Sequence, residues 1–197
     1  MPRARQPGDW ERDLSQARKA EAELSQVLAG DSRLDNFEDR TAEYERLDFA
    51  FEYGGLKIQL DLKEKRQRYS PDYQMMWPEV ASEDLFIMDE TVYRRIVWQG
   101  GGGYLAIHDH PSGRWCYFGP WELTLGPRIR YQRWGQKSGR SFLKGKILLD
   151  LNSAAHQSRN FSVEDLLRVI LRSAEALAAV EAFDIKGYPT REVGRYA

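Results

Sequence analysis

Two aspartates and a lysine fall on alternate positions of a segment that itself alternates hydrophobic and polar residues. Two stretches, LDFAFEY and LKIQLDLK, flank a Gly-Gly pair. Period-two alternation around such a pair is typical of a β-hairpin. A two-residue turn at the glycines places Asp48 opposite Asp61, with Lys63 two residues further along on the same face. The spacing therefore predicts two facing carboxylates beside an ammonium group.

Facing carboxylates need something to offset their repulsion, since like charges directly opposite in an antiparallel pair destabilise it by up to ~1 kcal/mol. A bound cation, a raised pKa on one acid, or screening by Lys63 and Arg46 would each do so. The alternative is a solvated outer face with both acids in water. We expect the other face of the hairpin to be core, because it carries Leu47, Phe49, Phe51, Tyr53, Leu56, Ile58, Leu60 and Leu62.

Three further elements would position this hairpin in a domain. Hydrophobic residues recur at helical spacing over residues 9–29, and Glu21 lies at the border of that hydrophobic face. A second helix is predicted to start at Asp89 or Thr91 and to end at the four-glycine run, where the strand GYLAIHD follows. Helix, hairpin, helix and strand in this order predict a crossover connection in a mixed α/β fold.

These residues resemble the PD-(D/E)xK nuclease superfamily, which has the restriction-endonuclease-like fold. The family pattern is a helix with a glutamate, a strand with an aspartate, and a strand with (D/E)-x-K. Here those positions are Glu21, Asp48 and the run Asp61-Leu62-Lys63, and the resemblance covers about residues 15 to 110.

The chain departs from the family pattern at two positions. Leu47 stands where the family has proline before the first aspartate, and Asp61 stands where glutamate is commoner. The resemblance implies an α/β fold, specifically an α+β mixed sheet. Its restriction-endonuclease-like core would be helix, β-hairpin, crossover helix and strand, extended by extra C-terminal strands and a long helix.

The resemblance also implies metal-dependent hydrolysis of phosphodiester bonds in DNA. Glu21, Asp48, Asp61 and Lys63 would be the catalytic residues. Asp48, Asp61 and the carbonyl of Leu62 would hold Mg²⁺ or Mn²⁺, which prefer oxygen ligands. The alternative is a catalytically inactive nucleic-acid-binding or oligomeric interaction protein on the same scaffold.

A basic segment later in the chain suggests a nucleic-acid contact. No acidic residue occurs between Leu123 and Leu149, and aromatic residues are interleaved with the basic ones. Such a segment suits phosphate contacts and base stacking, although an exposed basic hairpin without a partner is an equal alternative. The predicted nucleic-acid-binding residues are Arg128, Arg130, Arg133, Lys137 and Arg140.

The run HDHP offers His108 and His110 as metal ligands, because residues two apart on a strand share a face. His156 is the only other histidine, so the ligand count is short and we interpret the run as a strand end entering a turn. The single cysteine, Cys116, excludes an internal disulfide framework, and we interpret it as a packed strand residue.

Length and composition indicate a folded, soluble protein. The chain has 197 residues, 42% of them hydrophobic, and a net charge of -1. No stretch approaches the ~20 apolar residues of a membrane span, so we expect no membrane contact and a cytoplasmic location. We expect a nuclease-like core over 9–110, a β-rich basic and aromatic extension over 111–160, and a helix over 161–183. Ser162 would cap that helix, which could also form a homodimer.

Overall fold

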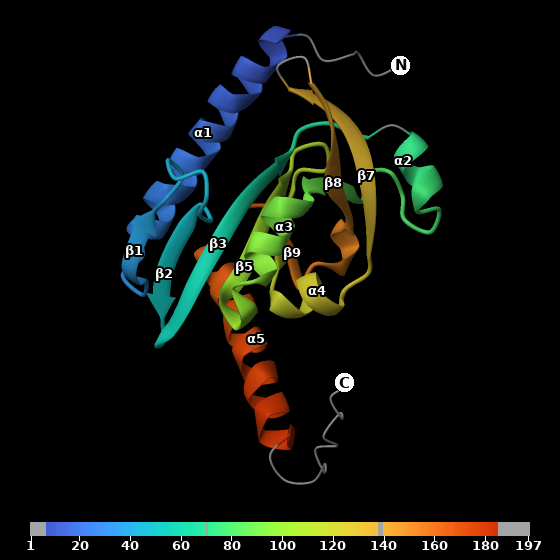
Figure 1. The fold of residues 1–197 in the computed structure, drawn as a ribbon. Coiled ribbons are helices and arrows are strands. Elements are labelled where there is room, and N and C mark those ends of the chain that lie inside the picture. The colour runs from blue at the N-terminus through green and yellow to red at the C-terminus, as the bar shows by residue number, and fades with distance from the viewer. Residues whose placement is uncertain (1–6, 70, 138–139, 185–197) are drawn as a thin grey trace, which may run out of the picture.

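The computed structural model describes residues 7–69, 71–137 and 140–184. Helices and strands are interspersed along these residues (Figure 1). They are α1 (Pro7–Ala29), β1 (Asp35–Asp39), β2 (Phe49–Tyr53), β3 (Leu56–Lys65), α2 (Pro71–Met76), β4 (Leu85–Asp89), α3 (Glu90–Val97), η1 (Gly100–Gly102), β5 (Gly103–Asp109), β6 (Arg114–Phe118), α4 (Pro120–Leu125), β7 (Arg128–Lys137), β8 (Arg140–Asp150), η2 (Leu151–Ser153), β9 (His156–Ser158) and α5 (Val163–Asp184). The predicted mixed α/β class is confirmed.

The larger sheet has six strands in the order β1-β2-β3-β5-β6-β9. Strands β3 and β5 are parallel, and the other neighbours are antiparallel. The chain leaves β3, passes through α2, β4 and α3, and returns as β5. A parallel pair requires such a crossover connection, so the predicted order of helix, hairpin, helix and strand is confirmed.

The hairpin of β2 and β3 has the predicted register. Tyr53 pairs with Leu56, and Ala50 pairs with Gln59. The turn residues Gly54 and Gly55 have φ angles of 56° and 80°. Glycine adopts this left-handed conformation without the steric cost that a side chain brings, which explains the Gly-Gly pair.

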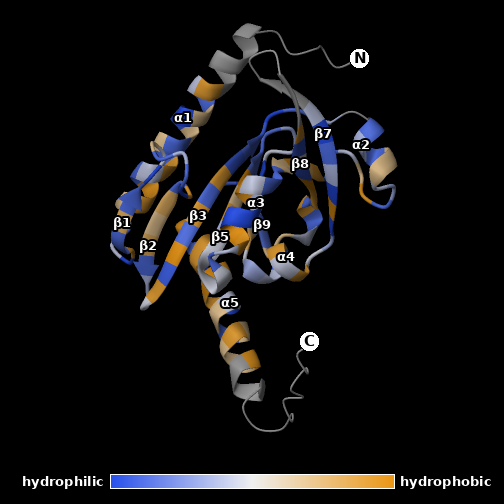
Figure 2. Ribbon diagram, in the orientation of Figure 1, coloured by the Kyte–Doolittle hydropathy of each residue, from blue (hydrophilic) through white to orange (hydrophobic). Residues whose placement is uncertain are grey.

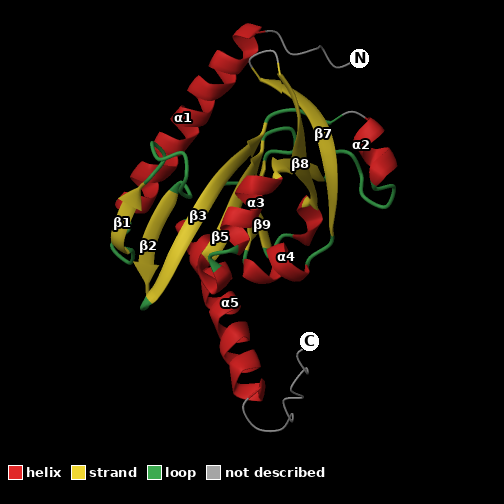
Figure 3. Ribbon diagram, viewed as in Figure 1, coloured by secondary structure: helices red, strands yellow, loops and turns green. Residues whose placement is uncertain are grey.

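A second sheet of three strands has the order β4-β8-β7 (Figure 3). Strand β4 is absent from the sequence prediction, because its residues LFIMD form a short hydrophobic run without alternation. Helix α2, in the connection between β3 and β4, is likewise absent from the sequence prediction. The predicted boundary after residue 110 separates β5 from β6, which pair as neighbours, and β4 pairs with β8 from the predicted extension.

Two hydrophobic clusters cover the two faces of the larger sheet. The first packs residues of α1 and α5, such as Leu24 and Ile170, on one face. The second packs α3 and the smaller sheet on the other face. Figure 2 shows hydrophobic and hydrophilic residues alternating along β3. Leu47 lies in the second cluster rather than with Phe49 in the first, so its predicted face is wrong; β2 begins only after it.

Helix α5 starts as the sequence predicts. The Ser162 Oγ accepts a hydrogen bond of 3.2 Å from the Asp165 backbone N–H. Its first turns are buried, and its later part projects from the sheets with Leu171 and Val180 exposed (Figure 1). The predicted homodimer stays a prediction. No described helix has the length and apolar character needed to cross a membrane.

Candidate functional site

The predicted acidic pair lies at the start of β2, beside the part of β3 that runs on past it. Pairing between the two strands stops at Phe49 and Leu60, whereas β3 runs on beside β5. Asp48 immediately precedes β2, and its Oδ2 accepts a hydrogen bond of 2.8 Å from the Leu62 backbone N–H. The Asp48 carboxylate therefore satisfies a backbone donor of β3 that β2 no longer reaches.

Three oxygen atoms surround the ammonium group of Lys63. Its Nζ lies 2.6 Å from Asp61 Oδ2 and 3.6 Å from Asp48 Oδ2. The same nitrogen donates a 2.8 Å hydrogen bond to the carbonyl oxygen of Leu62. These are the oxygens that the family resemblance implies as metal ligands. A cationic group thus already lies among them.

Asp61 is a buried carboxylate that lacks full hydrogen bonding. The residue is 2% exposed, and among the described side chains its Oδ2 is one of the buried oxygens without a hydrogen-bond partner. Lys63 Nζ forms an ion pair with this oxygen at 2.6 Å. Burial raises the pKa of Asp61 to about 6; the Lys63 charge opposes this rise and the Asp48 charge adds to it.

Two of the three expected ways to offset the repulsion are present. The pKa of Asp61 is raised, and Lys63 lies between the two acids. The expectation for Arg46 is wrong: its Nε pairs with Glu43 at 3.0 Å. The expectation of acids in open water is also wrong for Asp61, because this face of β3 is covered by the second hydrophobic cluster.

Glu21 belongs to the same electrostatic environment. This half-buried residue of α1 has a raised pKa, first because of burial and then because of the Asp48 charge, while the Lys63 charge lowers it. Such interactions require proximity, since solvent screens charges beyond about 10 Å. Glu21 is therefore close enough to Asp48 and Lys63 for their charges to act on it.

Arg95 is a site residue that sequence reasoning missed. It lies on α3, and its charge lowers the pKa of Asp61. Its Nη1 donates to the backbone carbonyls of Tyr44 at 2.9 Å and Arg46 at 3.3 Å. These contacts tie α3 to the segment before Asp48. Only the three-dimensional packing of α3 reveals the role, because the crossover helix carries no motif that singles out this arginine.

The donor set fits a divalent cation. Asp61 contributes a buried oxygen without a hydrogen bond, and Asp48 Oδ2 and the Leu62 carbonyl lie around the same point as the Lys63 ammonium. Carboxylate and carbonyl oxygens are the ligands that Mg²⁺ and Mn²⁺ prefer. The Lys63 side chain is partly exposed, at 29%.

The basic segment is less positive in the structure than in the sequence. Arg130 Nε donates to Glu90 Oε1 at 2.7 Å, and both Lys144 and Lys146 pair with Asp89. These acids come from β4 and α3, which lie outside the segment. The prediction for Arg130 is thus weakened by a partner that the linear sequence hides.

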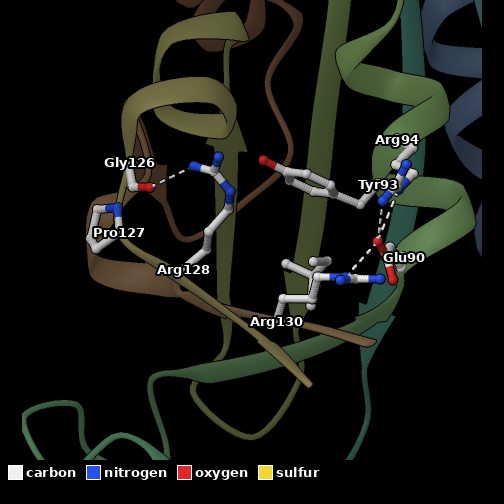
Figure 4. Close-up of a pocket in the computed structure, with 8 residues that line it drawn as sticks. Glu90, Tyr93, Arg94, Gly126, Pro127, Arg128 and Arg130 are labelled. Carbon is white, nitrogen blue, oxygen red and sulfur yellow. Dashed lines mark hydrogen bonds and ion pairs between the residues drawn. The ribbon is translucent and has the colours of Figure 1, made fainter. Parts of the chain in front are cut away.

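Two of the predicted nucleic-acid residues line a cavity of about 620 Å³ between α3 and β7 (Figure 4). Arg128 donates to the carbonyl of Gly126, and its guanidinium lies 5.7 Å from the Tyr93 ring centre. Arg133 is exposed, with its Nη1 3.5 Å from the Tyr73 hydroxyl. The side chains of Lys137 and Arg140 lie outside the described part of the structure.

A second cluster of possible ligands lies on the opposite face of β3. Glu64, His108 and His110 bring one potential ligand atom each within 4.8 Å of the others. The sequence interpretation of a simple strand end missed Glu64, although parallel pairing of β3 with β5 would have placed it beside His108. Cys116 is buried, and burial raises the pKa of its thiol to about 12, as a packed strand residue should have.

No protein-family model matches the chain, and comparison with curated protein sequences also finds no match. Membership of the nuclease superfamily thus stays a resemblance of residues. Function must be inferred from the geometry at Asp48, Asp61 and Lys63.

Proposed function

We propose that this protein is a metal-dependent nuclease that hydrolyses phosphodiester bonds, with DNA as the substrate. One observation carries the proposal: Asp48 Oδ2, Asp61 Oδ2 and the Leu62 carbonyl surround a single cationic nitrogen at the start of β2. Burying a carboxylate is costly even beside an ammonium group such as that of Lys63, so the arrangement needs a functional reason. Holding a divalent cation for catalysis is such a reason.

Asp48, Asp61 and the Leu62 carbonyl would hold Mg²⁺ or Mn²⁺. When bound, the ion supplies charge that polarises the phosphoryl group and balances the two carboxylates. Lys63 then becomes free of its present oxygen partners. Its ammonium is suited to bind a phosphate oxygen and to stabilise the negative charge that develops there during hydrolysis.

Glu21 is suited to orient the attacking water molecule. Burial and then the Asp48 charge raise its pKa, while the Lys63 charge lowers it, so both groups act on its carboxyl. A carboxylate in this position can accept a hydrogen bond from the water molecule. That bond would orient a lone pair of the water toward the phosphorus atom. Arg95 is a positioning residue, since it fixes the segment before Asp48 through the carbonyls of Tyr44 and Arg46.

Cleavage of a nucleic-acid panel tests the proposal. The panel contains single-stranded, duplex, flap and four-way-junction DNA together with RNA, each with Mg²⁺, with Mn²⁺ or with chelator. We expect cleavage of DNA only with a divalent ion, and losses of at least about 100-fold for Asp61→Asn and Lys63→Ala. Lys57→Ala is the matched control, because Lys57 is an exposed lysine of the same strand.

Two outcomes would contradict the proposal. One is a folded protein that cleaves no member of the panel under either ion. The other is cleavage that survives in Asp61→Asn, which would indicate another site or a contaminant. Circular dichroism of each variant shows that a lost activity is not a lost fold.

A nucleic-acid-binding protein without catalysis is the second candidate, and the exposed residues Arg133 and Trp134 on β7 favour it. It predicts salt-sensitive DNA binding that Arg133→Ala weakens, with no cleavage under either ion. The same panel distinguishes the two candidates.

A further inference from the structure

Three side chains with nitrogen and oxygen donors meet at the carboxyl ends of β3 and β5. Glu64 of β3 pairs in register with His108 of β5, and parallel neighbours in register project from the same face. His110 follows one residue after β5. One ligand atom from each of the three lies within 4.8 Å of the other two. The cluster thus joins one carboxylate and two imidazoles.

Ring contacts hold both imidazoles: His108 stacks on Trp115, and His110 lies against His108 with its plane tilted by 37°. The His108 ring stacks on Trp115, with ring centres 4.4 Å apart and planes only 9° from parallel. The His110 ring centre lies 3.8 Å from that of His108. The His110 backbone N–H also donates to the Lys65 carbonyl at 3.0 Å, which fixes the start of the turn. Little side-chain ordering would remain to be done on binding a ligand.

Arg66 fixes the orientation of the Glu64 carboxylate. Arg66 Nε donates a 3.1 Å hydrogen bond to Glu64 Oε2. The other oxygen, Glu64 Oε1, lies 2.8 Å from His110 Nε2. Ligating carboxylates in metalloproteins are commonly held by such a hydrogen bond on the second oxygen. Only 8% of the Glu64 side chain is exposed, and its Oε1 faces His110 Nε2.

We propose that Glu64, His108 and His110 bind one divalent transition-metal ion of the zinc class. Imidazole nitrogens select Zn²⁺, Co²⁺ and Ni²⁺ over Mg²⁺, and two histidines with one glutamate are a known zinc donor set. Within the described residues these three supply the protein ligands of the group, so water completes the coordination.

This ion is distinct from the one proposed for the nuclease site. Glu64 and Lys63 are adjacent in β3, and adjacent strand residues project to opposite faces of the sheet. The oxygen-only donor set around Lys63 suits Mg²⁺ or Mn²⁺, whereas the nitrogen-rich set at Glu64 does not. The second ion would connect β3 to the turn after β5 and stabilise that end of the sheet.

Titration of the metal-free full-length protein with Co²⁺ tests this site. Excess Mg²⁺ is present to occupy the oxygen site, and visible absorption of Co²⁺ bound to nitrogen ligands gives the signal. We expect one Co²⁺ per chain, displaced by one Zn²⁺. His110→Gln, which alters the exposed histidine of the group, should weaken binding at least 10-fold.

His156→Gln is the matched control, because His156 lies outside the cluster and pairs with Asp165 at 3.2 Å. It should bind Co²⁺ as the unaltered protein does. The proposal is overturned if the unaltered protein binds no stoichiometric Co²⁺, or if His110→Gln binds it equally well. The absorption signal does not depend on DNA cleavage, so this proposal and the nuclease proposal can fail separately.

Discussion

Folding makes the ionisation of Asp61 less favourable, because its carboxyl group is buried. Its pKa of about 6 exceeds the ordinary aspartate value of about 3.9, because burial disfavours the charged form. Between these values the folded state keeps a proton that the unfolded state releases. Stability therefore falls as the pH rises from about 4 to about 6, and the loss persists at higher pH.

Asp61→Asn should stabilise the protein at neutral and alkaline pH. The asparagine imitates the protonated acid, and Lys63 keeps Asp48 and the Leu62 carbonyl as partners. The two pKa values correspond to a gain of up to roughly 3 kcal/mol at pH 8, shrinking toward zero at pH 4. Urea unfolding in chelator at both pH values measures it.

Asp35→Asn serves as the control for that experiment, because Asp35 is an exposed acid of β1. Its stability relative to the unaltered protein should not change with pH in this way. An Asp61→Asn variant that is less stable at pH 8 than at pH 4, relative to the unaltered protein, would contradict the assigned cost of burial.

The sequence was sufficient to predict which acids and which lysine of the hairpin come together, since period-two alternation fixes the face of each residue. The sequence was not sufficient to predict that Arg95 lies at this site or that Glu64 joins the histidines. Arg95 reaches the site only because α3 packs beside the segment before Asp48. Glu64 joins the histidines only through the register of β3 and β5. The long connection between these two strands does not fix that register.

At the scale of the elements, a buried ion pair connects β3 to β5. Lys65 is 1% exposed, its Nζ lies 3.5 Å from Asp109 Oδ1, and these two residues are register partners. Arg114 Nε lies 3.1 Å from the other oxygen of Asp109. Burial lowers the pKa of Lys65 although the Asp109 charge opposes this. The alternation of residues along the strand gives no sign that this lysine is enclosed.

Lys65→Met should destabilise the protein by about 3 kcal/mol, because Asp109 Oδ1 would then be left without its buried counter-charge. Chemical denaturation measures the change, and Lys57→Met, which alters an exposed lysine of the same strand, should cost under about 0.5 kcal/mol. Adding Asp109→Asn to Lys65→Met should recover part of the loss. Equal stability of the Lys65 and Lys57 variants would refute a structural role for the pair.

The elements that the sequence predicted best are those with local signals. Residues 9–29 form most of α1, the Gly-Gly pair fixes the β2–β3 hairpin, and Ser162 starts α5. Strand β4 was missed because its pairing with β8 joins residues about sixty positions apart. That long-range pairing also brings Asp89 to the basic residues of β8, which local sequence cannot show.

At the scale of the molecule, β3 separates two candidate cation sites. Both faces of the larger sheet are covered, by α1 and α5 on one side and by α3 with the smaller sheet on the other. The oxygen site at Asp48 and Asp61 lies at the start of β2, and the histidine site lies at the end of β5. The different donor atoms predict that the two sites select different ions.

The central claim is that Lys63 occupies the place of a divalent cation. Anomalous diffraction from crystals soaked in Mn²⁺, with Zn²⁺ removed by chelation beforehand, tests it directly. We predict a Mn²⁺ peak about 2.0–2.3 Å from Asp48, Asp61 and the Leu62 carbonyl, with the Lys63 ammonium displaced toward solvent. Lys63 remaining among these three oxygens, with no Mn²⁺ peak beside them, would contradict the proposed site.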